Sequence, residues 1–436
     1  MVPPRSLARL VPVDNVGRAM LALGAALTFW TALRPAQFTP DTGTYLTHEV
    51  FRAPLCPWIL DLLQAAFGEA WPRALVILQA VLAGWSAAYL TQVLRVRLAL
   101  APVPAIALGA LLLMPQWQWA AYILTEATSY ALFLVLVAEL LESWHDRPSR
   151  HHLRAAVAIL GLIVLRPQFT YLVPVVAVHA GLVAWQHRSL RLGAGLVAMV
   201  VAAGAAGAVV QRGSNALYHG MWTPDPLSGL PILAKQMFLS TPEDAALFAD
   251  PADRALFTRV QARMAQMRLL QTSDPVMTGA PQSYTVIGER ICYFAVLPEV
   301  RALAGVANLD ARQWVAFGEQ SLRMATTLAR QRPREYVHHV LNQLRTTQGF
   351  FVLFALVVAA AGAWLALARG APWGIALSTV AAIAVANHFL IATVHILLQR
   401  YVFTTDVVLV AWVAAMLLRD TVRDTVRAPE RPAGSS

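Results

Sequence analysis

The sequence predicts an all-α polytopic membrane protein of about ten transmembrane helices with a helical extracytoplasmic region. Composition is the first observation: 58% of the 436 residues are hydrophobic and 13% are charged, whereas a soluble domain carries about 25% charged residues. Second, apolar runs close to the length of one bilayer crossing recur along the chain. Third, arginines collect near the ends of these runs, as the positive-inside rule describes for cytoplasmic loops.

The net charge of +10 comes largely from these loop arginines, so we expect membrane lipids and no nucleic acid as partners. Lys235 is the only lysine. Arg5, Arg9 and Arg18 precede the first apolar run, but no small-residue cleavage site closes it, so this span is expected to be retained as an anchor. The expected location is the bacterial inner (cytoplasmic) membrane, as a multi-pass protein with its active site on the periplasmic side.

The N-terminal transmembrane module is expected to cover residues 1–211 and to carry the first external loop, 35–73. The run 155–186 is too long for one crossing and has basic residues on both flanks, so it must cross an even number of times. Arg166-Pro167 near its middle marks the expected turn. The spans predicted in this module are 17–34, 74–94, 98–114, 126–141, two within 155–186, and 191–211.

Residues 212–347 contain no span and are expected to form the extracytoplasmic region. Helical periodicity at 242–270 and 310–345 predicts helices there. The run Thr241-Pro242-Glu243-Asp244 has the composition of a helix N-terminus: a capping residue, a proline at the first helical position, and acids in the first turn.

The C-terminal transmembrane helices are expected within 348–418, followed by a basic cytoplasmic tail, 419–436. The spans predicted here are 349–368, 373–397 and 402–418. Both termini are then cytoplasmic. Two cysteines, Cys56 and Cys292, fall in segments assigned to the outside. The sequence leaves open whether they form a disulfide or remain two separate buried thiols.

Polar side chains from separate points along the sequence map to the predicted external face. They are Asp41, His48, Arg52, Glu126, Arg166, Arg400 and Tyr401. Because randomly placed polar residues would divide between the two faces, this distribution indicates an external site covered by residues 212–347. Such a site would suit a substrate with a lipid tail in the bilayer and a polar head group outside.

The residue types indicate chemistry on an anionic head group. Arginine offers a fixed positive fork that matches phosphate oxygens, so Arg52, Arg166 and Arg400 could bind a phosphate and stabilise it as a leaving group. Asp41 could accept the proton of an attacking hydroxyl. Glycoside hydrolases need two carboxylates for two proton transfers, but a phosphate leaving group needs no protonation at neutral pH. One carboxylate and a cationic phosphate site are therefore sufficient for an attacking hydroxyl to displace the phosphate.

Several short motifs carry a family resemblance. They are Pro40-Asp41-Thr42-Gly43-Thr44-Tyr45 with Arg52-Ala53-Pro54 downstream, Leu124-Thr125-Glu126, Leu165-Arg166-Pro167, and Gln399-Arg400-Tyr401-Val402-Phe403. The first of these resembles the first external loop of the GT-C glycosyltransferases, multispan enzymes that take a sugar from a polyprenyl-phosphate carrier, and the others fit the same pattern. The resemblance does not extend to 212–347.

The resemblance implies an inverting transfer of a single hexose or pentose outside the cytoplasm, from a polyprenyl-phosphate donor to a lipid, glycan or protein acceptor. Asp41 would correspond to the general base, and Arg400 would lie near the carrier phosphate. The expected substrate-binding residues are Arg52, Glu126, Arg166, Arg400, Tyr401, Tyr45 and His48. Thr42 follows Asp41 where one branch, the protein O-mannosyltransferases, has an acidic pair, which weakens a match to that branch. No clustered acidic ligand set of the usual kind is visible, so a divalent metal is not supported and no cofactor is expected.

Structural roles are the alternative for each of these residues. Asp41 could cap a turn, Glu126 could pair with Arg166 only to support the fold, and Arg166 and Arg400 could extend to the interface from span ends. At the level of the whole protein, the alternatives are a flippase or transporter of a lipid-linked saccharide and a surface-polysaccharide polymerase or ligase. The chain shows no internal repeat of the kind common in transporters.

Overall fold

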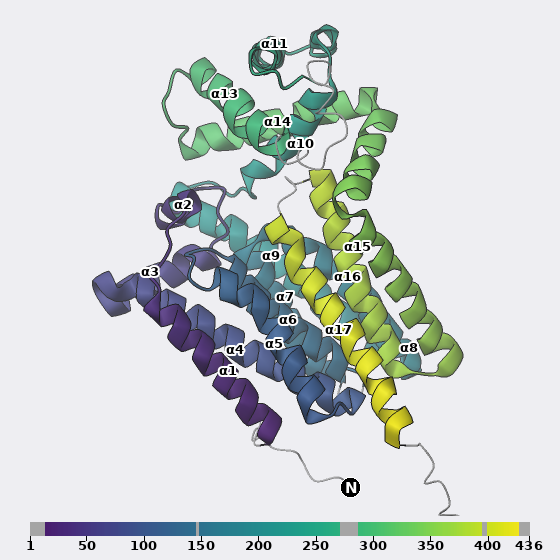
Figure 1. The fold of residues 1–436 in the computed structure, drawn as a ribbon. Coiled ribbons are helices and arrows are strands. Elements are labelled where there is room, and N and C mark those ends of the chain that lie inside the picture. The colour runs from purple at the N-terminus through teal and green to yellow at the C-terminus, as the bar shows by residue number, and fades with distance from the viewer. Residues whose placement is uncertain (1–13, 145–147, 271–286, 395–398, 427–436) are drawn as a thin grey trace, which may run out of the picture.

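The computed structural model describes residues 14–144, 148–270, 287–394 and 399–426 (Figure 1). Within these ranges the chain is helical and has no β-strand, so the expected all-α class is confirmed. The helices that pack around the main hydrophobic core are α1 (Asn15–Leu33), α4 (Trp71–Leu98), α5 (Pro102–Trp119), α6 (Glu126–Glu142), α7 (Pro148–Leu165), α8 (Leu172–Gln186), α9 (Leu190–His219), α15 (Pro333–Arg369), α16 (Pro372–Val394) and α17 (Gln399–Val426).

Six segments are long and apolar enough to cross a membrane, judged by length and composition, which supports a multi-pass membrane protein. They are Asn15–Leu33, Leu55–Leu98, Pro167–Gln186, Leu190–His219, Pro333–Arg369 and Trp373–Val394. Only 22% of the most apolar window of α9 and of α15 is buried, as expected for helices whose outer faces contact lipid. The count of about ten crossings stays a prediction.

The long apolar run 155–186 forms two helices, as predicted. Helix α7 ends at Leu165, the 3-10 turn η3 spans Pro167–Tyr171, and α8 begins at Leu172. Pro167 is the cause, because a proline disfavours helical geometry in the residue before it. Arg166 accordingly has an extended backbone, with φ −154° and ψ 109°. The break leaves the Arg166 side chain at the junction of two helices.

A second hydrophobic core lies at one end of the bundle, in the upper part of Figure 1. It is built by α10 (Gly229–Leu239), α11 (Pro251–Gln266), α13 (Leu297–Ala304) and α14 (Ala311–Gln331), together with the turns η4 (Pro226–Ser228), η5 (Pro242–Leu247) and the π-helical η7 (Ile287–Val296). Thr241 caps η5 and the Asp244 side chain accepts from its backbone N–H at 2.8 Å, so a helical turn starts there as predicted. The helix expected over 242–270 is nevertheless interrupted at 248–250, and α11 begins at Pro251 with Asp250 as its cap.

The boundaries of this region differ from those expected. Helix α9 continues to His219, past the expected end at residue 211. The expected helix 310–345 is divided near Arg332, because Pro333 begins a new helix whose first turn needs no proline N–H. That new helix, α15, then runs without interruption to Arg369. The placement of 212–347 on the extracytoplasmic side stays a prediction.

The first loop contains two short helices, α2 (Pro40–Leu46) and α3 (Leu55–Phe67), before the 3-10 turn η2 (Gly68–Ala70) leads into α4. Cys56 is buried in the cluster beneath this loop, and Cys292 is buried in the second core. Both cysteines are free, so the structure shows two separate buried thiols and no disulfide between them.

Helices α15 and α16 approach each other through two glycines. A Cβ built on Gly374 would lie 2.5 Å from the Gly362 carbonyl oxygen and 2.9 Å from the Ala366 nitrogen. Gly374→Leu is therefore expected to lower the unfolding free energy by about 1–3 kcal/mol, measured by thermal unfolding in detergent. Gly195→Leu in α9 is the matched control, because a Cβ there meets nothing within 4 Å. Equal melting temperatures for the two variants would contradict this packing.

Candidate functional site

Asp41 lies in the first turn of α2, which Thr39 and Pro40 begin. The Arg52 Nη2 donates to Asp41 Oδ1 at 2.6 Å, and Arg52 Nε donates to the Thr44 hydroxyl at 2.7 Å. The loop residues 47–54 turn back after α2, which is how Arg52 reaches across to Asp41 eleven positions earlier. Asp41, Thr44 and Arg52 therefore form one polar group, and Asp41 does more than cap a turn.

The polar group packs against Tyr45, which is itself surrounded by apolar side chains. The Arg52 guanidinium lies over the Tyr45 ring, 4.6 Å from its centroid. Tyr45 is itself buried in a hydrophobic cluster that includes Leu124 and Leu165. These two residues lie next to the other sequence motifs, since Glu126 begins α6 and Arg166 follows α7. One cluster therefore brings together motifs that lie about eighty and one hundred and twenty residues from Asp41 in the sequence.

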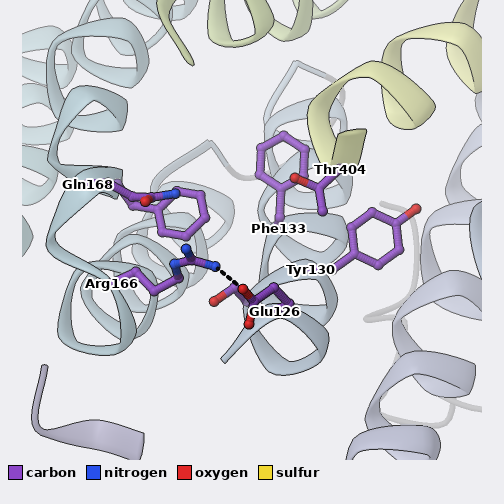
Figure 2. A pocket seen from close by; sticks show the side chains of 8 residues that line it. Glu126, Tyr130, Phe133, Arg166, Gln168 and Thr404 are labelled. Carbon is purple, nitrogen blue, oxygen red and sulfur yellow. Dashed lines mark ion pairs between the residues drawn. The ribbon is translucent and has the colours of Figure 1, made fainter. Parts of the chain in front are cut away.

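Glu126 and Arg166 form a second ion pair, with Arg166 Nη1 3.3 Å from Glu126 Oε1. Both side chains are mostly buried, at 5% exposure for Glu126 and 13% for Arg166. Figure 2 shows them pointing toward each other at the edge of a small cavity. The cavity is lined by Glu126, Ser129, Tyr130, Phe133, Arg166, Gln168, Phe169 and Thr404.

The electrostatic environment of Tyr45 indicates that the two ion pairs are neighbours. Burial raises the pKa of the Tyr45 hydroxyl to about 12; Arg52 and Arg166 each act to lower this pKa, while Glu126 acts to raise it. A side chain that senses charges from both pairs lies between or beside them. Asp41 with Arg52 and Glu126 with Arg166 therefore belong to one candidate site.

His48 makes contacts that support the fold. Its Nε2 lies 2.9 Å from Asp61 Oδ2 of α3, and its ring stacks on Tyr218 with centroids 4.2 Å apart. The His219 Nε2 and the His48 carbonyl oxygen are 2.7 Å apart. These contacts join the first loop to α3 and to the end of α9. A substrate-binding role for His48 stays a prediction.

Arg400 and Tyr401 lie in the first turn of α17, but their side chains lie outside what the structure describes. Thr404, four residues after Arg400 in the same helix, lines the cavity beside Phe133 and Tyr130 (Figure 2). Thr404 lies in the second turn of α17, so this part of the helix borders the cavity that holds the Glu126–Arg166 pair.

Asp225 is a carboxylate that the sequence reasoning did not select. It lies six residues after the end of α9 and caps η4, accepting from the Leu227 N–H at 2.8 Å. Burial raises the pKa of Asp225 to about 6, and the nearby positive charge of Arg52 opposes that rise. A second acidic group thus lies near the Asp41–Arg52 pair. A proline on each side of Asp225, next to an apolar run, was the available signal.

The described residues contain no group of three or more His, Cys, Asp and Glu side chains placed to bind a metal ion. His338 and His339, for example, are neighbours in α15, and the His338 Nε2 lies 3.0 Å from the Asn342 amide nitrogen. The expectation that the protein uses no cofactor stays a prediction.

Comparisons with known proteins give structural neighbours only. No protein-family model matches the chain. No curated protein matches it in sequence. Among solved structures, the chain is similar to ArnT from Cupriavidus metallidurans bound to undecaprenyl phosphate, with 13% identity and a TM-score of 0.35 over 95% of this chain and 79% of ArnT. It is also similar to the apo structure of the same protein, with 16% identity and a TM-score of 0.33 over 88% of this chain and 76% of ArnT.

Proposed function

We propose that this protein is an integral-membrane glycosyltransferase that moves one sugar from a polyprenyl-phosphate donor to an acceptor on the extracytoplasmic side of the membrane. The observation that carries the proposal is the convergence of Asp41, Arg52, Glu126 and Arg166 around Tyr45. These residues supply one candidate base and two guanidinium groups at one end of an apolar helix bundle. That is the minimum set for displacement of a lipid-linked phosphate.

Asp41 is proposed as the general base. The guanidinium of Arg52, 2.6 Å away, stabilises a negative charge on this carboxylate, and the ionised form is the one that can accept a proton. Arg52 is itself oriented by Thr44 and by the ring of Tyr45. The side chain of Asp41 remains one-third exposed, at 34%, so an acceptor hydroxyl can approach it.

The reaction forms one bond at the anomeric carbon of the sugar and breaks another. The acceptor oxygen attacks the anomeric carbon of the sugar, and the bond from that carbon to the phosphate oxygen breaks on the opposite side. The electron pair leaves with the polyprenyl phosphate, and the acceptor proton passes to Asp41. Arg166, and Arg400 at the start of α17, would stabilise the phosphate as charge develops on it.

Glu126 is proposed to orient Arg166 at the helix junction. A buried guanidinium without a partner is costly, so the Glu126 carboxylate supports Arg166 while the site is empty. When the donor binds, the phosphate supplies a second acceptor for the same guanidinium, which has five N–H donors. The polyprenyl chain would then lie along the lipid-facing surface of the bundle.

Product analysis tests this function against its alternatives. Purified protein in liposomes is supplied with a polyprenyl-phosphate monosaccharide carrying a labelled sugar, together with envelope lipids and glycans as acceptors. We expect release of free polyprenyl phosphate in equal amount to the transferred sugar, with one sugar added per acceptor. Movement of intact donor across the liposome without its consumption would show a flippase instead. Transfer of a preassembled oligosaccharide from a diphosphate carrier would show a ligase.

A further inference from the structure

Helix α10 lies in the middle of the second core, and almost every residue of it is buried. Lys235, the only lysine of the chain, is in this helix and is 4% exposed. Its ammonium donates to the Ile391 carbonyl oxygen at 3.3 Å and also to the Ala392 carbonyl oxygen. An unusual buried cation therefore reaches from the second core to the end of α16.

Both acceptors belong to the last turn of α16, which ends at Val394. The last four carbonyl groups of a helix have no intrahelical partner, and they carry the negative end of the helix dipole. Tyr336 of α15 adds a third contact, because its hydroxyl donates to the Thr393 carbonyl oxygen at 2.6 Å. Side chains outside α16 thus bind three successive carbonyl groups of its last turn. We call these three hydrogen bonds the α16-end contact.

The α16-end contact lies close in sequence to the candidate site. Helix α17 begins at Gln399, five residues after the end of α16, and its first turn contains Arg400. Thr404, one turn later, lines the cavity with Glu126 and Arg166. His388, near the end of α16, also contacts α17 directly, with its Nε2 2.8 Å from Asp406 Oδ1. A shift in the end of α16 would therefore move this part of α17 relative to the Glu126–Arg166 pair.

The surroundings of Lys235 offer it no carboxylate among the described residues. Cys292 of η7 and His339 of α15 are the titratable groups that interact electrostatically with it. Tyr336 binds the neighbouring carbonyl, and the only titratable side chain of α16, His388, contacts Gln348 of α15 and Asp406 of α17. The buried face of α14 that packs against α10 contains no titratable side chain: Trp314, Phe317, Gly318, Ser321, Met324, Ala325 and Leu328.

We propose that Lys235 is a positioning residue, which stabilises the end of α16 against the second core and so places the first turn of α17 beside the Glu126–Arg166 cavity. This inference rests on the proposed function only in assigning a carrier phosphate to that turn. Lys235 touches neither Glu126 nor Arg166; it acts through the backbone of α16.

The charge of Lys235 makes this arrangement sensitive to pH. Burial lowers the pKa of Lys235 to about 7, whereas a solvated lysine has a pKa of about 10.4. The arrangement in which the α16-end contact is formed, called the closed arrangement here, therefore binds the proton of Lys235 less tightly than an arrangement in which Lys235 is hydrated. Raising the pH from 7 toward 10 favours the closed arrangement, and below pH 7 this dependence disappears because the lysine is protonated in both arrangements.

Hydrogen–deuterium exchange of peptides covering 388–404 tests this directly, with each rate divided by the intrinsic rate at the same pH. In the wild type, protection of these peptides is expected to rise at least about threefold between pH 6.5 and 8.5, within the limit of about tenfold per pH unit that linkage allows. Lys235→Met should lower the protection at pH 8.5, where the neutral amine of the wild type donates to the α16 carbonyls without the cost of a buried charge, and should remove the pH dependence. Peptides from α1 and α4 should not change in any variant.

Tyr336→Phe is the matched control, because it removes a donor to the adjacent carbonyl without removing a charge. It should lower protection of 388–404 and keep the pH slope. Lys235→Arg stays protonated throughout this range, so it should lose the slope even if the Met variant fails to fold. The same protection and slope in both Lys235 variants as in the wild type would overturn the proposal.

Binding of undecaprenyl phosphate separates this inference from the proposed function. If the wild type binds this lipid and Lys235→Met raises its Kd at least about fivefold at pH 8.5, the positioning role is supported. An unchanged Kd overturns that role. If the wild type binds no undecaprenyl phosphate at any pH, the proposed function fails, while the exchange result at the end of α16 still decides whether Lys235 stabilises it.

Discussion

Asp41→Asn is expected to reduce sugar transfer from a polyprenyl-phosphate donor by about 10²–10⁴-fold, the range that a general base contributes. The substitution keeps an oxygen that can accept from Arg52, so the first loop should keep its geometry. It removes the negative charge and the ability to take up the acceptor proton. Initial rates in proteoliposomes, together with donor Kd, provide the measurement. We expect kcat to fall while donor Kd changes little.

The control for this variant is Asp310→Asn. Asp310 is an exposed N-cap of α14, and its side chain accepts from the Gln313 N–H at 2.8 Å. Asparagine caps helices about as well as aspartate, so this variant should transfer sugar at the wild-type rate. Wild-type rates in Asp41→Asn as well would remove Asp41 from the mechanism. Asp225→Asn then becomes the next variant to test, because Asp225 is the second carboxylate near Arg52.

The second large effect concerns the Glu126–Arg166 pair, where a phosphate-binding role and a structural role make opposite predictions. Arg166→Gln removes an ion-pair partner of the buried Glu126 carboxylate, and breaking a buried ion pair costs about 3–5 kcal/mol in stability, so lost activity in this variant alone is ambiguous. The double variant Glu126→Gln/Arg166→Gln removes both charges and avoids that penalty. A double-mutant cycle on the Kd for undecaprenyl phosphate therefore separates the two roles.

If Arg166 binds the carrier phosphate, Glu126→Gln should change lipid binding little, because the amide oxygen that replaces the carboxylate can still accept from Arg166 and orient it. Arg166→Gln and the double variant should both weaken binding by at least about tenfold, as expected for loss of a charge-assisted hydrogen bond. Recovery of wild-type Kd in the double variant would instead show that the pair only supports the fold. Thermal unfolding of all three variants shows which of them remain folded.

The sequence predicted those parts of the fold that depend on local chemistry. Pro167 determined where the run 155–186 divides, and the position of Arg166 followed from it. Thr241 and Asp244 marked the start of η5 in the same way. The ends of α9 and α15 were not predicted, because both helices continue into segments whose polar residues resembled a loop. Helix α10 was also missed, since a helix buried on nearly all sides shows no amphipathic period.

The candidate site was predicted as a set of residues, but their arrangement was not. The pairing of Arg52 with Asp41 depends on the turn formed by residues 47–54, and the cluster of Tyr45, Leu124 and Leu165 depends on tertiary packing. Neither is visible as a motif. His48 was selected as a candidate site residue because it lies near Asp41 in the sequence. The structure shows contacts of His48 that join the first loop to α3 and α9.

A structure of the protein with a polyprenyl phosphate bound tests the central claim most directly. We expect the phosphate to lie within hydrogen-bond distance of Arg166, beside the first turn of α17. Asp41 should then face the side of the phosphate where the sugar carbon would lie, with the prenyl chain against the apolar bundle. A phosphate bound away from both Arg166 and Asp41, for example at the opposite end of the helices, would contradict it.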